Sequence, residues 1–498
     1  MTDPSTTQSG RFTEGSVVWP LLVLAGPLTA TQLLQVAYNL TDAFWVGRLG
    51  ADAVSALSFS WPLLFLLISV GGGMTNAGTI LVSQHVGAGN DGRLNHIAGQ
   101  TIAFVGLLSV GVATLGVLFA PQLLRLIGVP PGTAVYGLAV TYTRIIVSGM
   151  PFTFGFFVFM ALLRGWGDTK TPMYLMALSV GLNIVLDPFF VLGFADNPLF
   201  GWVGLNDLQA SLLAATGFTG LGVKGAALAT VLSRAVAAIV GLWLLFSARV
   251  GLQLSRDDLL LEADTVAQIV RIGGPGAIDQ STQSIAAIVM TALIATVGTD
   301  AVAAYGIGNR FISLVWLPTV AMGMSVETVV GQNLGGGQPD RARRTVYSAI
   351  TILATAFLIV GFITVWFAQP IIGVFISGPD APSIISHGAT FLRIVAPTWA
   401  IMVSYHMMNG AFYGAGSTRL AMSIGVTTLW GVRAVTALVL VFVLRFGATG
   451  AWYAIALSNA TAAITGAVVF FRGRWMGNVL ADNSTECSAT DTDEEVST

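Results

Sequence analysis

The chain has 498 residues, of which 54% are hydrophobic and 9% are charged, and its formal net charge is −2. Soluble domains carry about 25% charged residues, so a mean hydropathy of +0.79 indicates that lipid surrounds most of this chain. This composition excludes a cytosolic enzyme, a secreted domain and a protein that binds nucleic acid through a basic surface.

Twelve long apolar runs follow one another, each near or above the roughly 20 residues that a helix needs to cross a bilayer. The runs are continuous rather than alternating, which predicts spanning helices and not a lipid-facing barrel. The expected spans are 17–46, 53–83, 95–119, 134–163, 172–194, 222–248, 265–297, 301–331, 344–368, 383–413, 419–444 and 449–471. The predicted fold class is therefore all-α, a polytopic membrane protein with twelve transmembrane helices.

Basic residues are distributed unevenly between the two sides of these spans. Twelve stand at one set of span ends: Arg11, Arg93, Arg164, Lys170, Arg249, Arg256, Arg341, Arg343, Arg344, Arg419, Arg472 and Arg474. Four stand at the other: Arg48, Arg125, Lys224 and Arg445. Because cytoplasmic ends carry the excess of Lys and Arg, we expect a cell-membrane protein with both termini in the cytoplasm.

The two halves of the chain repeat each other in a constant register. GADAVSA at 50–56 recurs as GTDAVAA at 298–304, an offset of 248 residues that also pairs Gln84 with Gln332 and Gly87 with Gly335. The offset spans six helices, an even number, so both halves enter the membrane in the same direction. This pattern predicts two parallel six-helix lobes with a cavity between them, which suits alternating access rather than a pore.

The repeat and the polar segments divide the chain into five parts. They are a cytoplasmic N-terminal segment at 1–16, an N-lobe of spans 1–6 at 17–248, a cytoplasmic linker at 249–264, a C-lobe of spans 7–12 at 265–472 and a disordered acidic cytoplasmic tail at 473–498. The outer loop at 195–221 is either a simple connector or a lid over a cavity. The single cysteine, Cys487, lies in the tail, so no intrachain disulfide can form.

Four acidic residues fall inside the spans, where a carboxylate costs about 2.5–3.5 kcal/mol and is a functional candidate. They are Asp42, Asp187, Asp279 and Glu327. Asn183 stands one helical turn before Asp187, so one helix face presents an amide and a carboxylate together. Such a site can bind and release a proton, or hold Na⁺ with the help of neutral oxygen ligands.

The two acids of the second lobe are open to two interpretations. Asp279 shares a polar helix face with Gln283, and Glu327 lies on the next span. Each is either a transport residue or half of a buried ion pair, for which Arg310 and Arg433 are the possible partners. We likewise expect Arg234 in span 6 to belong to an ion pair inside its lobe or at a helix end.

Aromatic and polar residues of spans 1 and 4 are candidates for lining a substrate cavity. Gln35, Tyr38 and Asn39 belong to span 1, and Tyr142 belongs to span 4. The two tyrosines either stack on organic cations or belong to the packed core.

Motifs of enzymes and cofactor sites are missing from the sequence. It contains no GxxxxGK[ST] phosphate-binding loop, its four histidines have no metal-binding spacing, and no nucleophile and base stand together. We therefore expect neither an enzyme nor a bound cofactor, and no metal beyond a coupling ion.

The chain resembles the multidrug and toxic compound extrusion (MATE) family from about 17 to 472. The motifs that carry the resemblance are GP at 26–27, VGRLG at 46–50 after Asp42, Gln84 with GAG at 87–89, RGWGDTK at 164–170 and GVKGAA at 222–227. The resemblance implies a V-shaped pair of lobes that exposes a site to each side of the membrane in turn and exchanges H⁺ or Na⁺ for small amphipathic, often cationic compounds. It further implies a monomer in the lipid bilayer, without nucleic acid.

Within that family the chain is similar to the DinF-type branch, which implies a cation-coupling site in the N-lobe. By motif match, the span 1 aspartate of that branch falls on Asp42 and its span 5 pair on Asn183 and Asp187. Its span 6 carbonyl and threonine fall on Ala226 and Thr230. Sodium would then bind at Asp42, Asn183, Asp187 and Thr230, and the choice between H⁺ and Na⁺ stays open.

Two positions depart from that branch. Phe157 and Met160 stand in span 4 where the branch tends to have asparagines. Two other transporter classes are alternatives. A lipid-linked oligosaccharide flippase of the same superfamily is the alternative function, but it would need a wide cationic cavity to hold pyrophosphate. A major-facilitator transporter also has parallel halves, but the motifs above disfavour it.

Overall fold

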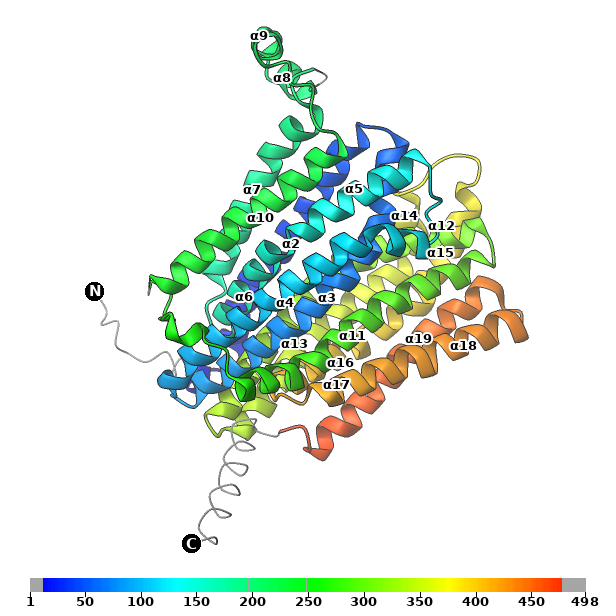
Figure 1. Ribbon diagram of the computed structural model, residues 1–498. Helices are drawn as coiled ribbons and strands as arrows, with labels where there is room; N and C mark the ends of the chain where they lie inside the picture. Colours follow the sequence, from blue (N-terminus) through cyan, green and yellow to red (C-terminus); the bar gives the residue numbers. More distant parts are fainter. Residues whose placement is uncertain (1–11, 196, 248, 477–498) are drawn as a thin grey trace.

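The computed structural model describes residues 12–195, 197–247 and 249–476, and within them the chain is helical and contains no strand (Figure 1). Cys487 and the predicted acidic tail beyond residue 476 lie outside the described residues. In the first half the helices are α2 (Val18–Gly47), α3 (Ala51–Gly87), α4 (Asp91–Leu126), α5 (Ala134–Ser148), α6 (Met150–Trp166), α7 (Lys170–Leu192), α8 (Pro198–Trp202), α9 (Asn206–Thr216) and α10 (Val223–Phe246). We call α2 to α10 the N-lobe.

The second half, which we call the C-lobe, repeats this order. Its helices are α11 (Ala263–Ala295), α12 (Thr299–Gly335), α13 (Pro339–Trp366), α14 (Ala368–Gly373), α15 (Ala381–Val395), α16 (Trp399–Gly414), α17 (Thr418–Val426), α18 (Val435–Leu438) and α19 (Gly447–Arg472). Two π-helical segments, Thr427–Ala434 and Val439–Val443, flank α18. The residue boundaries of the two lobes in the sequence stay a prediction.

Long apolar helices account for almost all the predicted spans. Ten helices of the described chain are long and apolar enough to cross a membrane, and α5 with α6, bent by 49°, brings the number to eleven. The remaining predicted span, 383–413, is built from α15, a 3₁₀ turn at Ala396–Thr398 and α16. Pro397 lies in that turn and cannot donate a helical hydrogen bond, which explains the break. The predicted all-α membrane fold is confirmed.

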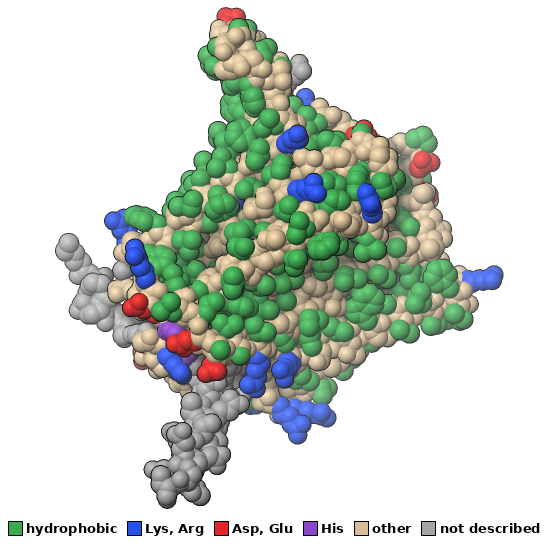
Figure 2. Space-filling model, viewed as in Figure 1, with side chains coloured by type: hydrophobic (Ala, Val, Ile, Leu, Met, Phe, Trp, Pro, Cys, Tyr) green, Lys and Arg blue, Asp and Glu red, His purple; other side chains and the backbone are tan. Residues whose placement is uncertain are grey.

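Side chains on the outside of the bundle match a lipid environment. Apolar side chains cover the visible flank of the helices, whereas many of the charged ones gather toward the helix ends (Figure 2). Large residues such as Trp366 and Phe362 expose about 70% of their surface (72% and 69%). A water-soluble protein rarely exposes so much apolar surface, so the outside of the bundle matches a lipid environment.

The motif at 164–170 forms the tight turn between α6 and α7. Gly167 ends α6 with a positive φ of 98°, a conformation that glycine adopts without strain. Asp168 then accepts hydrogen bonds at Oδ1 from the backbone N–H groups of Lys170 (2.9 Å) and Thr171 (3.1 Å). These bonds satisfy amide groups at the start of α7, which would otherwise lack partners.

Both ends of the described chain are fixed at one end of the bundle. The Arg341 guanidinium donates to the backbone carbonyls of Glu14 (2.8 Å) and Gly15 (2.9 Å) near the first helix. Ser417 donates to the carbonyl of Trp475 just after the last helix (3.1 Å). Helices α8 and α9 project from the opposite end (Figure 1).

The two lobes meet along a seam with internal symmetry. Helix α3 packs against α11 and α12, and α2 packs against α12. The Gln84 side chain donates from Nε2 to the carbonyl of Gly414 (2.9 Å), and its repeat partner Gln332 donates to the carbonyl of Gly165 (3.0 Å). The same offset that pairs the two glutamines in the sequence therefore pairs their bonds across the lobes.

Two glycines make this close approach possible. A Cβ at Gly87 would overlap the backbone carbonyl of Gln332, and a Cβ at Gly335 would overlap that of Gln84. The helices touch there backbone to backbone, as small residues allow in membrane bundles. Arg341 and Ser417, which hold the two chain ends, come shortly after α12 and α16. The glutamine bonds lie at the ends of these same helices, so the chain ends and these bonds are at one end of the molecule.

The first prediction concerns this seam. We expect Gly87→Ala to lower the free energy of unfolding by about 1–3 kcal/mol, because the added methyl group forces two backbones apart. The measurement is thermal unfolding of the purified protein in detergent. Gly92→Ala is the matched control, because a Cβ there meets no atom within 4 Å. Equal melting temperatures for the two variants would contradict the prediction.

Candidate functional site

Two aspartates from different helices meet inside the N-lobe. Asp42 lies near the end of α2 and Asp187 near the end of α7, and these two helices pack together. Both side chains are buried, with 5% and 0% of their surface exposed. The Asn183 amide lies between them and donates from Nδ2 to Asp42 Oδ1 (3.1 Å) and to Asp187 Oδ1 (3.1 Å). One amide group thus bridges two carboxyl groups.

Helix α10 completes the cluster from a third side. Thr230 donates from Oγ1 to the second oxygen of Asp42, Oδ2, at 3.3 Å. Ala226 is buried one turn earlier on the same helix, and its role as a carbonyl ligand stays a prediction. The structure therefore brings together the predicted side chains Asp42, Asn183, Asp187 and Thr230, which we call the carboxylate cluster.

Several oxygen atoms of the carboxylate cluster are available to bind a cation. The carboxyl groups of Asp42 and Asp187 lie close together, because the one Asn183 Nδ2 donates to both at 3.1 Å. Two ionised carboxylates repel each other and only accept hydrogen bonds, so a proton or a metal cation beside them would be stabilising. Asn183 Oδ1 and Asp187 Oδ2 are also buried without a hydrogen-bond partner. Such oxygen atoms suit either a proton or a hard monovalent cation.

The predicted cavity residues lie beside this cluster in two different environments. Tyr38 and Tyr142 are buried, with 3% and 2% of their surface exposed. The Tyr38 hydroxyl lies 3.0 Å from Ser233 Oγ on α10. Gln35 donates from Nε2 to Asn39 Oδ1 (3.0 Å), and Asn39 is exposed. Asn39 is therefore at the surface of the bundle and the tyrosines pack inside the lobe, while the half-buried Gln35 lies between these two environments.

A buried arginine that was expected in an ion pair has neutral partners instead. The Arg234 guanidinium lies over the rings of Tyr38 (4.7 Å to the centroid) and Phe156 (5.2 Å), and its Nη2 donates to Gln35 Oε1 (2.8 Å). No carboxylate of the described chain lies within 4 Å of it, so the expectation of an ion pair is wrong. The sequence did indicate that Arg234 lies near the predicted site, because it stands one turn after Thr230 on the same helix face.

The C-lobe acids do not pair with the predicted arginines, although Arg164 of the N-lobe interacts with Glu327 through space. Asp279 Oδ2 accepts from the Tyr413 hydroxyl (3.1 Å) and from Gln283 Nε2 (3.2 Å). Glu327 is buried on α12, and its Oε1 has no hydrogen-bond partner. Arg433 donates to Ser458 Oγ (2.7 Å) and Asn459 Oδ1 (3.0 Å).

Within the part of the chain that the structure describes, neither acid lies within 4 Å of Arg310 or Arg433, so the predicted ion pairs with these two arginines are not formed. The ion pair found there, between His96 and Glu262 at 3.0 Å, joins α4 to the linker instead. Arg310, the other possible partner, is exposed on α12.

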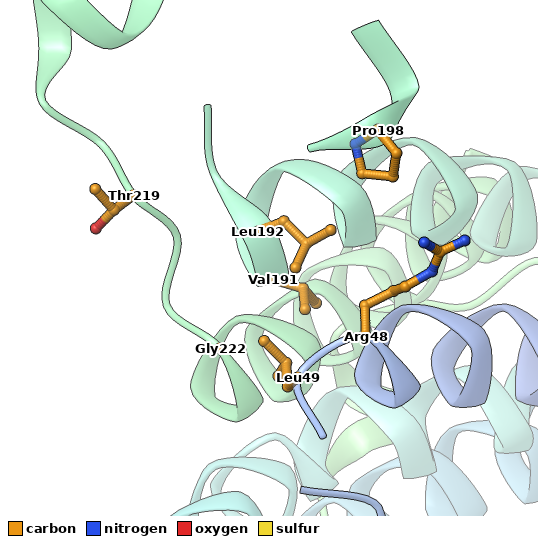
Figure 3. A pocket seen from close by; sticks show the side chains of 7 residues that line it. All are labelled: Arg48, Leu49, Val191, Leu192, Pro198, Thr219 and Gly222. Carbon is orange, nitrogen blue, oxygen red and sulfur yellow. The ribbon is translucent and has the colours of Figure 1, made fainter. Parts of the chain in front are cut away.

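A pocket lies at the end of the N-lobe where α8 and α9 leave the bundle, opposite the end that holds the chain termini (Figure 1). It has a volume of about 580 Å³ and is lined by Arg48, Leu49, Val191, Leu192, Pro198, Thr219 and Gly222 (Figure 3). Pro198 belongs to the segment at 195–221, so this excursion covers one side of the pocket. Arg48 follows Asp42 by six residues on the same helix, which places the pocket beyond the carboxylate cluster.

The second prediction tests the amide bridge. We expect Asn183→Leu to destabilise the protein by about 1–3 kcal/mol for each carboxyl group that loses its donor in the dry interior. Thermal unfolding in detergent measures the effect. Asn206→Leu on the exposed surface of α9 is the control and should leave the melting temperature nearly unchanged. A melting temperature of Asn183→Leu equal to that of the control would show that the bridge does not stabilise the fold.

Comparison with known proteins gives one consistent answer. The MatE family model matches residues 27–189 and 275–439. The chain is 30% identical to the probable multidrug resistance protein YoeA of Bacillus subtilis, over 90% of this chain and 92% of that protein. It is 27% identical to the probable multidrug resistance protein NorM of Thermotoga maritima, over 91% and 92%. A crystal structure of MATE in complex with MaL6 shares the fold, with a TM-score of 0.82 at 23% identity over 94% of this chain and 99% of the other.

Proposed function

Because the chain belongs to the MatE family, whose members are membrane transporters and not enzymes, we propose that it expels amphipathic organic compounds in exchange for H⁺ or Na⁺. The observation that carries the proposal is the carboxylate cluster. Two buried carboxyl groups share one amide donor there, and a monovalent cation would neutralise one of them. The interior of a membrane protein otherwise tolerates such groups poorly.

Helix α2 links the site to the rest of the molecule. It carries Asp42, contacts α7 beside the cluster and contacts α12 of the C-lobe across the seam. A cation that binds at Asp42 changes the charge at one end of a helix that also touches the other lobe. Two conformations that differ in cation affinity are then populated differently, and substrate binding is coupled reciprocally to cation binding.

Both candidate ions suit the chemistry of the cluster. A proton needs one carboxyl oxygen and a nearby acceptor, which Asp42 and Asp187 provide. Sodium needs several oxygen ligands, which the two carboxyl groups, the Asn183 amide and the Thr230 hydroxyl provide. The location of the cluster in the N-lobe is the one that resemblance to the DinF-type branch implies.

The proposed setting is the cell membrane, with both termini in the cytoplasm and the seam at the cytoplasmic end. The excess of basic residues at that end supports this orientation. The substrates are small, amphipathic and often cationic compounds, and a monomer suffices because each chain contains both lobes. A flippase for pyrophosphate-linked sugars is not favoured, because the buried arginines Arg234 and Arg433 already bind neutral groups inside the lobes.

The third prediction separates the two aspartates from other acids. We expect Asp42→Asn and Asp187→Asn each to abolish ethidium efflux, because an amide takes up no proton and lacks the negative charge that a coupling cation neutralises. The protein is reconstituted in vesicles, and efflux is driven first by a pH gradient and then by a Na⁺ gradient alone. Asp52→Asn, an exposed residue in the first turn of α3, is the matched control and should retain efflux.

Two results would sink this proposal. One is full efflux in both aspartate variants, and the other is wild-type protein that neither gradient drives. Asp279→Asn in the same assay shows which lobe holds the coupling site. We expect this variant to retain gradient-driven efflux, because Asp279 is a single carboxyl group that already accepts two hydrogen bonds.

A further inference from the structure

We infer that Arg234 is a built-in cation of the carboxylate cluster and that it limits the cluster to one exchangeable monovalent cation. The inference rests on the proposed function and adds to it the number of ions per cycle. It makes Arg234 a positioning residue, which acts on the coupling ion through charge and without touching it.

The structure holds the guanidinium at a fixed place. Arg234 exposes 5% of its surface and lies between the faces of Tyr38 and Phe156, with Phe157 at 6.0 Å. Its Nη2 donates to Gln35 Oε1 (2.8 Å) and its Nη1 to Met176 Sδ (3.4 Å). Aromatic faces and neutral acceptors of this kind hold a cation in place and leave its charge uncancelled.

The uncancelled charge belongs to the same interior as the two aspartates. Arg234 stands one turn after Thr230, which donates to Asp42, and Arg234 and Asp42 interact through space. The Tyr38 hydroxyl connects the two, because it lies 3.0 Å from Ser233 Oγ and 3.4 Å from the carbonyl of Thr230. Arginine stays protonated in proteins, so this charge is not exchangeable.

A charge count then gives the number of exchangeable ions. The charged and titratable groups that surround the cluster are Asp42, Asp187, Arg234 and the neutral phenols Tyr38 and Tyr142. Two ionised aspartates and one arginine sum to −1, and one bound H⁺ or Na⁺ makes the interior neutral. Without Arg234, neutrality would need two bound cations. An apolar interior strongly disfavours net charge. The favoured state of the cluster is therefore the neutral one, with one cation bound.

Phe157 adds a further aromatic ring beside the guanidinium, with the ring centroid 6.0 Å away. Like the rings of Tyr38 and Phe156, this ring offers a face to the cation and no negative charge. The aromatic surroundings of Arg234 therefore leave its charge free to act on the carboxylate cluster.

The experiment counts ions released per protein. Purified protein in detergent, in a weakly buffered solution with a pH indicator, is saturated with ethidium, and released protons are counted; bound ²²Na⁺ is counted in parallel. We expect one released cation per wild-type protein and two for R234Q. R234K, which restores the charge, should return the count to one. R433Q, which removes a buried arginine with neutral partners in the C-lobe, is the matched control and should also give one.

The outcomes separate the two proposals. A count of two in the wild type, or of one in a folded R234Q protein, overturns the role of Arg234. A count of zero for both ions in the wild type overturns the proposed antiport instead. R234M is a second neutral variant that fills the aromatic space, should R234Q not fold. If neither neutral variant folds, the wild-type count alone decides, because two exchangeable cations beside a charged Arg234 contradict the inference.

Discussion

Every charge inside this bundle must be balanced, because the hydrocarbon around it supplies no water. In the described interior, acids and arginines do not pair directly. The acids accept hydrogen bonds from amide and hydroxyl groups, and the buried arginines donate to neutral oxygen and sulfur atoms. Charges kept apart in this way leave a net imbalance at the carboxylate cluster that a mobile cation can correct. An arginine paired directly with each aspartate would neutralise the carboxylates and leave no charge for a mobile cation to balance.

The contact between the lobes likewise uses few polar side chains. The seam relies on close backbone approach at Gly87 and Gly335 and on two glutamine side chains that reach opposite carbonyls. Helix α3 also packs along α11, so the lobes meet over a long surface as well as at this end. Helix α2 carries Asp42 and contacts α12, which places the carboxylate cluster and part of the lobe contact on one helix.

Much of this architecture could be predicted from the sequence, and the parts that could not have a common cause. Apolar runs give the spans, and a constant offset gives the parallel lobes. The spacing of Asn183 and Asp187 gives one helix face of the site. Hydropathy says which residues avoid water but not which helices face each other, so the stacking of Arg234 on Tyr38 was missed. The break at Pro397 was missed for a different reason, since a proline in a long apolar run leaves the run intact.

The symmetry of the seam has a consequence for how such a chain could arise. Gln84 and Gln332 make the same bond, each to a carbonyl of the opposite half, so the seam is an isologous interface within one chain. A single half carrying one such glutamine and one such glycine could form the whole seam with a second copy of itself. Fusion of two copies would then preserve the interface unchanged while freeing each half to diverge. The two halves of this chain do differ in their acids, since the carboxylate cluster lies in one half and Asp279 and Glu327 lie in the other.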